Sequence, residues 1–142
     1  MLTLDLARSL SAAGLHWTPT RGDRFHVPDR DLDDAVFVLS DMVIESVRAP
    51  DGRELLAFNG TTEWALDSLE ASEALWLPRE EQLRTALGPA FGSLAAVPDP
   101  TSRSGTAWAV VVERGDRTER VVDVDAECAL ARALLVVLDP RS

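Results

Sequence analysis

The sequence predicts an α+β fold: one domain, residues 1–142, in which an antiparallel sheet is covered by three main helices. Two observations support this class. Runs with strand-like patterning occur in two separate groups, and three other segments combine apolar residues with helix-capping residues. The predicted strand groups span about 35–58 and 106–124, and the predicted helices span about 4–13, 78–87 and 126–138. A chain of 142 residues, 46% of them apolar, is long enough to bury one core.

The N-terminal segment predicts a short amphipathic helix. Thr3 is a good N-cap residue, and Leu6 and Leu10 lie four residues apart. Gly14 has the position of a glycine that closes a helix. Prolines and a glycine interrupt the next stretch, in which only Arg24–Val27 is long enough for a small strand.

Three strand-like runs follow, at 35–39, 42–48 and 53–58, and they predict an antiparallel meander. The last two runs are separated by Pro50-Asp51-Gly52, which has the composition of a tight turn. The segment Thr61–Leu69 fits either a helical or a strand period, and we predict a short helix there.

The middle of the chain predicts a brief strand and the second main helix. Ala74–Leu77 is apolar and has the length of a short strand. Pro78 at a first helical position and Gly88 past the end are typical of a helix that closes at Leu87.

The C-terminal part predicts a hairpin and the third helix. After a loop at Pro98–Gly105, runs at Thr106–Glu113 and Arg117–Val124 flank a turn at Gly115-Asp116. Asp125 is a good cap for the helix that follows.

This last helix is apolar on every side apart from Glu127 and Arg132, and such a helix must be covered all round. We expect the cover to come from layers of its own domain. The alternative is a helix shared with a second copy of the chain.

The chain contains no lysine, and all fourteen of its basic residues are arginine. Isoleucine, asparagine and glutamine occur only once each, which indicates a GC-rich bacterial genome and not a functional demand. The absence excludes a Schiff-base lysine and a phosphate-loop lysine. No glycine-rich phosphate loop occurs in the sequence either.

Charge and hydropathy restrict the partners. A formal net charge of −10 repels phosphate backbones and anionic lipid surfaces, so we expect no nucleic-acid partner and no membrane partner. No segment reaches the roughly 20 apolar residues of a membrane span. The first residues also lack a signal-peptide pattern, and we expect a cytoplasmic protein.

The densest polar cluster contains Asp29, Asp31 and Asp33, whose alternate spacing resembles the start of an EF-hand calcium loop. The match then fails, because Asp34 stands where the sharp-turn glycine is required and Ser40 where the bidentate glutamate is required. We therefore prefer a solvated acidic loop and keep a divalent-metal site as the alternative.

The nucleophiles and bases are few. His16 and His26 lie ten residues apart, and with Cys128 or Asp23 they could be arranged as a nucleophile, a base and an orienting group, but no nucleophile-elbow motif accompanies them. We interpret both histidines as structural and Cys128 as a buried, inert thiol. We predict no catalytic residue and no cofactor.

One segment is rich in small and aromatic residues. If the protein binds a small ligand, we expect the site at Phe58, Glu63 and Trp64. The tryptophans are spread along the chain, and we expect them to anchor one core. They are Trp17, Trp64, Trp76 and Trp108.

Three segments carry a resemblance: Gly22–Phe25, Phe58–Leu66 and Trp76–Glu80. They are similar to segments of small acidic actinobacterial proteins of unassigned function, some of which carry a borrowed pilus-assembly name. That name implies a relation to an ATPase. The sequence departs from an ATPase because it has neither a phosphate-binding loop nor a lysine to place in one. The resemblance therefore implies a family and no mechanism.

We favour a non-catalytic module that works by binding another protein, as a homodimer or with a different protein partner. Two other functions stay open. One is a small carboxylate-dependent or Mg²⁺-dependent enzyme, which requires at least three carboxylates around one point. The other is a ligand-binding module with an aromatic pocket, which requires a closed cavity near Trp64.

Overall fold

The computed structural model describes residues 1–27, 36–39, 43–48, 54–58, 68–70 and 74–139. The chain divides into two compact units, each described separately below. Unit 1 contains Met1–His16 and Pro78–Ser142, and unit 2 contains Trp17–Leu77. Helices and antiparallel strands occupy separate parts of the sequence, which confirms the α+β class. The organisation as a single domain stays a prediction.

The first helix of unit 1, α1, spans Leu4–Ala12. The Thr3 hydroxyl accepts a hydrogen bond from the Leu6 amide at 3.3 Å, as its N-cap position predicts. Gly14 has a φ of 102° and donates to the Ser11 carbonyl, while the Leu15 amide donates to the Leu10 carbonyl. These two bonds form a Schellman motif and close the helix at the predicted glycine.

The second helix, α2, spans Glu80–Leu87, and the short 3₁₀ helix η2 spans Gly88–Ala90. The helix begins two residues later than predicted, because Arg79, not Pro78, precedes its first turn as the N-cap. The Gln82 side chain accepts a hydrogen bond from the Arg79 amide at 2.9 Å, so this N-cap amide has a hydrogen-bond partner. The end at Leu87 and Gly88 is as predicted.

Unit 1 contains an antiparallel sheet in the order β7-β8-β9. Its strands are β7 at Phe91–Pro98, β8 at Thr106–Arg114 and β9 at Arg117–Asp123. The predicted hairpin is confirmed: Arg114 pairs with Arg117 across the two-residue turn, and Gly115 has a φ of 62°, which glycine adopts without strain. Strand β7 was not predicted.

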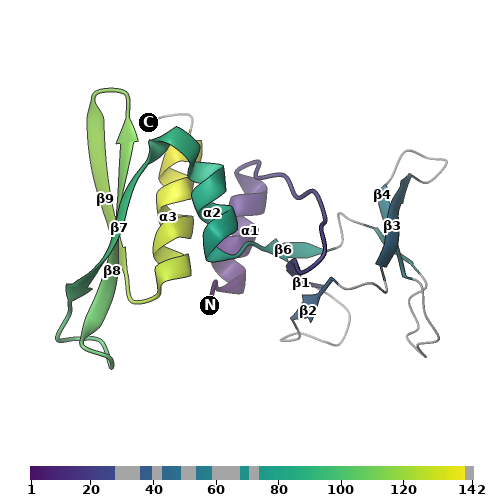
Figure 1. The fold of residues 1–142 in the computed structure, drawn as a ribbon, viewed down its shortest axis with the longest axis horizontal. Helices are drawn as coiled ribbons and strands as arrows, with labels where there is room; N and C mark the ends of the chain where they lie inside the picture. Colours follow the sequence, from purple (N-terminus) through teal and green to yellow (C-terminus); the bar gives the residue numbers. More distant parts are fainter. Residues whose placement is uncertain (28–35, 40–42, 49–53, 59–67, 71–73, 140–142) are drawn as a thin grey trace. The chain divides into compact units, whose positions relative to one another are not determined.

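The third helix, α3, spans Ala126–Leu138 and is covered on two sides within unit 1. It packs against β8 and β9 on one side and against α1 and α2 on the other, as the yellow helix in Figure 1 shows. Leu130 and Ala133 have no exposed surface. The layers of its own unit therefore account for the apolar character of this helix.

The first sheet of unit 2 has the order β2-β1-β6. Strand β1 spans Arg24–His26, β2 spans Phe37–Val38 and β6 spans Leu75–Leu77. Phe25, Val27 and Leu39 form its buried core. The Trp17 ring stacks on Trp76 with ring centroids 6.4 Å apart, so aromatic packing stabilises this small sheet.

The second sheet of unit 2 has the order β3-β4-β5. Strand β3 spans Val43–Arg48, β4 spans Glu54–Phe58 and β5 spans Ser68–Glu70. The antiparallel β3–β4 pair agrees with the prediction. The predicted turn at Pro50-Asp51-Gly52 lies outside the described residues.

Three details of the prediction are wrong. The strand groups at 35–58 and 106–124 belong to different sheets, and β2 pairs with β1 instead of continuing a meander into β3. Strand pairing is a long-range choice that local patterning does not specify. Ser68 and Leu69 lie in β5, not in a helix, while the rest of the predicted 61–69 helix lies outside the described residues.

The expectation of one tryptophan core is also wrong in part. Trp17 and Trp76 lie together in unit 2, whereas Trp108 lies on β8 in unit 1. Trp64 lies outside the described residues.

Candidate functional site

Most of the sequence-predicted site residues lie outside the part of the chain that the structure describes. They are Asp29, Asp31, Asp33, Glu63 and Trp64. Phe58 is the last residue of β4, where only the backbone course is described. The metal site and the aromatic ligand site therefore stay predictions. Within the described ranges, no group of three His, Cys, Asp or Glu side chains is arranged to hold a metal ion.

The histidines and the cysteine are divided between the two units: His16 and Cys128 belong to unit 1 and His26 belongs to unit 2. His16 is exposed, while His26 is buried in β1. Cys128 is buried in the first turn of α3, as predicted, and burial raises the pKa of its thiol to about 11. Since the thiolate is the nucleophile, burial and the raised pKa disfavour reaction of this cysteine at neutral pH.

Asp23 is a buried carboxylate with a structural role. Its Oδ2 atom accepts hydrogen bonds from the Trp17 indole at 2.9 Å and from the Thr20 amide at 3.0 Å. Gly22 has a φ of 90°, which completes the turn before β1. The carboxylate orients the Trp17 ring in the aromatic core of unit 2 and has the partners that a buried charge requires.

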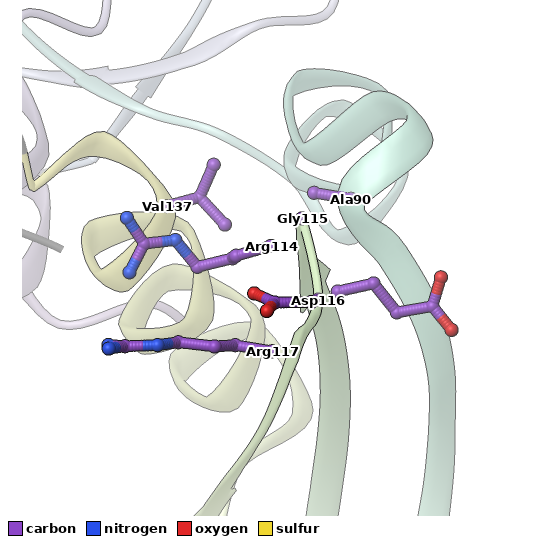
Figure 2. A pocket seen from close by; sticks show the side chains of 7 residues that line it. Ala90, Arg114, Gly115, Asp116, Arg117 and Val137 are labelled. Atoms are coloured by element: carbon purple, nitrogen blue, oxygen red, sulfur yellow. The ribbon is translucent and has the colours of Figure 1, made fainter.

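A shallow pocket lies beside the β8–β9 hairpin tip and has a volume of about 500 Å³. Its lining residues are Ala90, Glu113, Arg114, Gly115, Asp116, Arg117 and Val137. Figure 2 shows the Arg114 and Arg117 side chains extending from the hairpin in the same direction, with Asp116 on the turn between them. The pocket therefore contains two cationic and two anionic groups, and its lining is divided about equally between polar and apolar surface.

Arg114 has a clear structural role in this pocket. Its Nη1 atom lies 3.8 Å from a Glu119 carboxylate oxygen, and its Nη2 atom donates to the Asp139 carbonyl at 3.5 Å. These contacts join the hairpin to the end of α3. Small-ligand sites are mostly apolar with a few converging polar groups, so the mixed lining favours a structural junction over a ligand site.

The two edges of the β7-β8-β9 sheet differ sharply in charge. The edge strand β9 carries Arg117, Glu119, Arg120 and Asp123 in seven residues. The other edge strand, β7, carries no charged residue in eight, and the uncharged stretch extends from Thr85 to Pro98. In a chain with 27% charged residues, such a stretch on a sheet edge is unusual. We call the outward side of β7 the neutral edge.

The neutral edge is open among the described residues, where β7 pairs with β8 alone. Leu94 and Val97 are only half buried, and Ala95 and Ala96 are exposed. An unpaired edge presents a row of backbone donors and acceptors that can pair with another chain. Natural edges are usually protected by charges, as β9 is, or by Pro and bulges.

Protection on β7 is confined to its two ends. The register shifts between Phe91 and Ser93, and Pro98 has no amide hydrogen to donate. The regular segment between them, Ser93–Val97, is therefore the part of the neutral edge that can accept a further strand.

The start of β7 is held by unit 1 itself. The Arg84 guanidinium of α2 lies 4.9 Å from the centroid of the Phe91 ring. A side chain at Gly92 would place its Cβ 2.8 Å from the Val111 carbonyl oxygen, so only glycine fits this close approach to β8. These contacts fix the position of the strand and of the edge that it presents.

Sequence reasoning missed the neutral edge because it did not assign β7 to a strand. The segment contains glycine, serine and alanine, and it lacks both alternation and β-branched residues apart from Val97. The available signal was the long uncharged stretch directly before the hairpin.

No described helix combines the length and the apolar character that a membrane crossing requires.

No protein-family model, curated protein or solved structure matches this chain in comparisons with known proteins. The fold and the properties of the described residues are therefore the basis for the function proposed below.

Proposed function

We propose that this chain is a non-catalytic protein-interaction module that binds another polypeptide as an added strand along the neutral edge. The observation that carries the proposal is the open and uncharged segment Ser93–Val97 on a sheet whose opposite edge is charged. In strand addition, main-chain hydrogen bonds supply affinity and alternate side chains supply specificity.

The surrounding structure supports this proposal. Strand β7 pairs with β8 over its whole length, from Phe91 to Pro98, and its first residue is held by Arg84. A firmly held strand loses little conformational freedom when a partner binds, so more of the interaction energy appears as affinity. We place the module in the cytoplasm and retain the proposed relation to small acidic actinobacterial proteins of unassigned function.

A photo-crosslinking experiment in the native host tests this function. A benzoyl-phenylalanine is placed at Ala95 on the neutral edge or, as a matched control, at Thr118 on β9; both positions are exposed. We expect a discrete protein adduct at position 95 and none at position 118. A Ser93→Lys change beside the probe should reduce the adduct, because it places a charge on the edge.

Comparison of the two probe positions distinguishes specific binding at the neutral edge from non-specific association. The same adducts at both positions, or no protein adduct at position 95, would contradict the proposal. The mass of the adduct also tells whether the partner is a second copy of the chain or a different protein.

A further inference from the structure

We infer that the strand added to the neutral edge is β7 of a second copy of this chain, so that two copies form one continuous six-stranded sheet. This inference rests on the proposed function and names its partner. A two-fold axis passing through the Ser93–Val97 segment would relate the two β7 strands and make them antiparallel.

Charge is the first argument for a second copy. Each chain carries a net charge of −10, so two copies repel each other over most relative orientations. The stretch from Thr85 to Pro98 carries no charge, and β9 carries four charged residues. The neutral edge is therefore a part of this sheet along which two copies can approach without placing any charged side chains opposite each other.

Self-complementarity is the second argument. A two-fold interface requires a surface that fits itself, and an antiparallel strand pair meets this condition when residues pair symmetrically about its centre. With Ala95 on the axis, Ser93 of one copy lies opposite Val97 of the other, and Leu94 opposite Ala96. Every such pair is small or apolar, and none brings two large side chains together.

Burial is the third argument. Leu94 and Val97 retain exposed surface beside the unpaired backbone edge. A second β7 strand would cover these side chains and pair the backbone groups at the same time, which makes the two gains cooperative. The regular segment ends at the register shift on one side and at Pro98 on the other, so the pairing has a defined length.

Analytical ultracentrifugation of the purified full chain over a range of concentrations tests the dimer. We expect a species of twice the 15.5 kDa chain mass at high concentration. The variant Ala95→Lys places two like charges at the axis, and we expect it to raise the dissociation constant about tenfold or more. The matched control Thr118→Lys, at an exposed position on β9, should leave it unchanged.

A second measurement reports directly which residues lie close together in the dimer. Cys128 is the only native cysteine and is buried, so Ala95→Cys supplies the one accessible thiol. A short bismaleimide should join two Ala95→Cys chains efficiently and two Thr118→Cys chains poorly. Circular dichroism of each variant confirms that it is folded.

The outcomes separate the two proposals. A monomer at every concentration, or a dimer that Ala95→Lys does not weaken, overturns the homodimer. If the chain is monomeric while the Ala95 probe forms an adduct with a different protein, the interaction function stands and only the identity of the partner is wrong. If the Ala95 probe forms no protein adduct, the proposed function fails as well.

Discussion

The two edges of the β7-β8-β9 sheet differ in charge and in support. The β9 edge is charged, and α3 packs against β9 and β8. Asp123 at the end of β9 also pairs with Arg132 of α3 at 2.7 Å. The neutral edge is held by β8 and by the contact between Arg84 and Phe91. The charged edge is thus protected and anchored, while the neutral edge is held in place and has no second neighbouring strand among the described residues.

This difference shows that one edge of a sheet can be protected against pairing with another strand while the other edge of the same sheet is not. Both strands belong to one sheet and pair with the same central strand, so their backbones have the same capacity for hydrogen bonding. Side-chain charge distinguishes them. The following predictions perturb the support shared by both edges, then the neutral edge, then the charged edge.

The largest effect is expected from Leu130→Ala in α3, which removes support from the whole sheet. Leu130 has no exposed surface, and its truncation leaves a cavity between the layers of unit 1. We expect the free energy of unfolding to fall by about 2–5 kcal/mol, measured by urea denaturation. The exposed Ala86→Gly change in α2 is a control that tests general helix weakening, expected to cost about 1 kcal/mol. Equal effects of the two changes would argue against the central position of α3.

A change at Gly92 should affect the neutral edge. Gly92→Ala brings a Cβ to 2.8 Å from the Val111 carbonyl oxygen, so β7 must shift away from β8. We expect a loss of about 1–3 kcal/mol in the free energy of unfolding. The substitution should accelerate amide hydrogen exchange more in β7 than in β9, relative to the natural protein. The neighbouring Ser93→Ala change, at an exposed position, should stay within about 0.5 kcal/mol of the natural protein.

The smallest effect is expected at the end of the charged edge, where β9 leads into α3. Asp125 caps α3 through a 3.0 Å hydrogen bond from the Cys128 amide, and it pairs with the Met1 amine at 2.7 Å. Asp125→Ala should lower the free energy of unfolding by about 0.5–2 kcal/mol. Asp125→Asn, which can still cap the helix, should retain part of the stability.

The pH dependence of unfolding sharpens this prediction. Burial opposes ionisation of Asp125, but hydrogen bonds from the Met1 amine and the Cys128 amide outweigh it and hold its pKa below the ordinary 3.8. Hydrogen bonding to Asp125 raises the pKa of the Met1 amine above 8.0. The carboxylate contribution is lost as pH falls through its depressed pKa, and the amine contribution as pH rises through its raised pKa. The free energy of unfolding of the Asp125→Ala variant should depend less on pH than that of the natural protein, at both the acidic and the alkaline limit. An unchanged pH profile would show that the pair does not contribute.

The features that the sequence predicted correctly are local ones. Thr3, Gly14 and Asp125 were identified as helix caps because capping depends on residues three or four positions apart. The Gly115 turn was predicted for the same reason, since a two-residue hairpin has a short-range signature.

The features that were missed depend on distant residues. Strand β7 has weak strand propensity, and its conformation is stabilised by pairing with β8. The division of the strands into separate sheets likewise depends on pairing between segments far apart in the sequence. Neither strand propensity nor a sequence motif predicts the neutral edge. An edge is a property of strand pairing, because it exists where a strand has a neighbour on one side only. The predicted metal residues Asp29, Asp31 and Asp33 lie outside the described residues and stay untested.

The arrangement of α3 against α1 has a consequence for biosynthesis. The helix at Leu4–Ala12 leaves the ribosome before unit 2, but the helix that covers it, Ala126–Leu138, leaves only after all of unit 2. At about 5–20 residues per second, the first helix waits on the order of ten seconds for its partner. During that interval its apolar face is available to chaperones, and unit 2 has time to fold before the two ends of unit 1 meet.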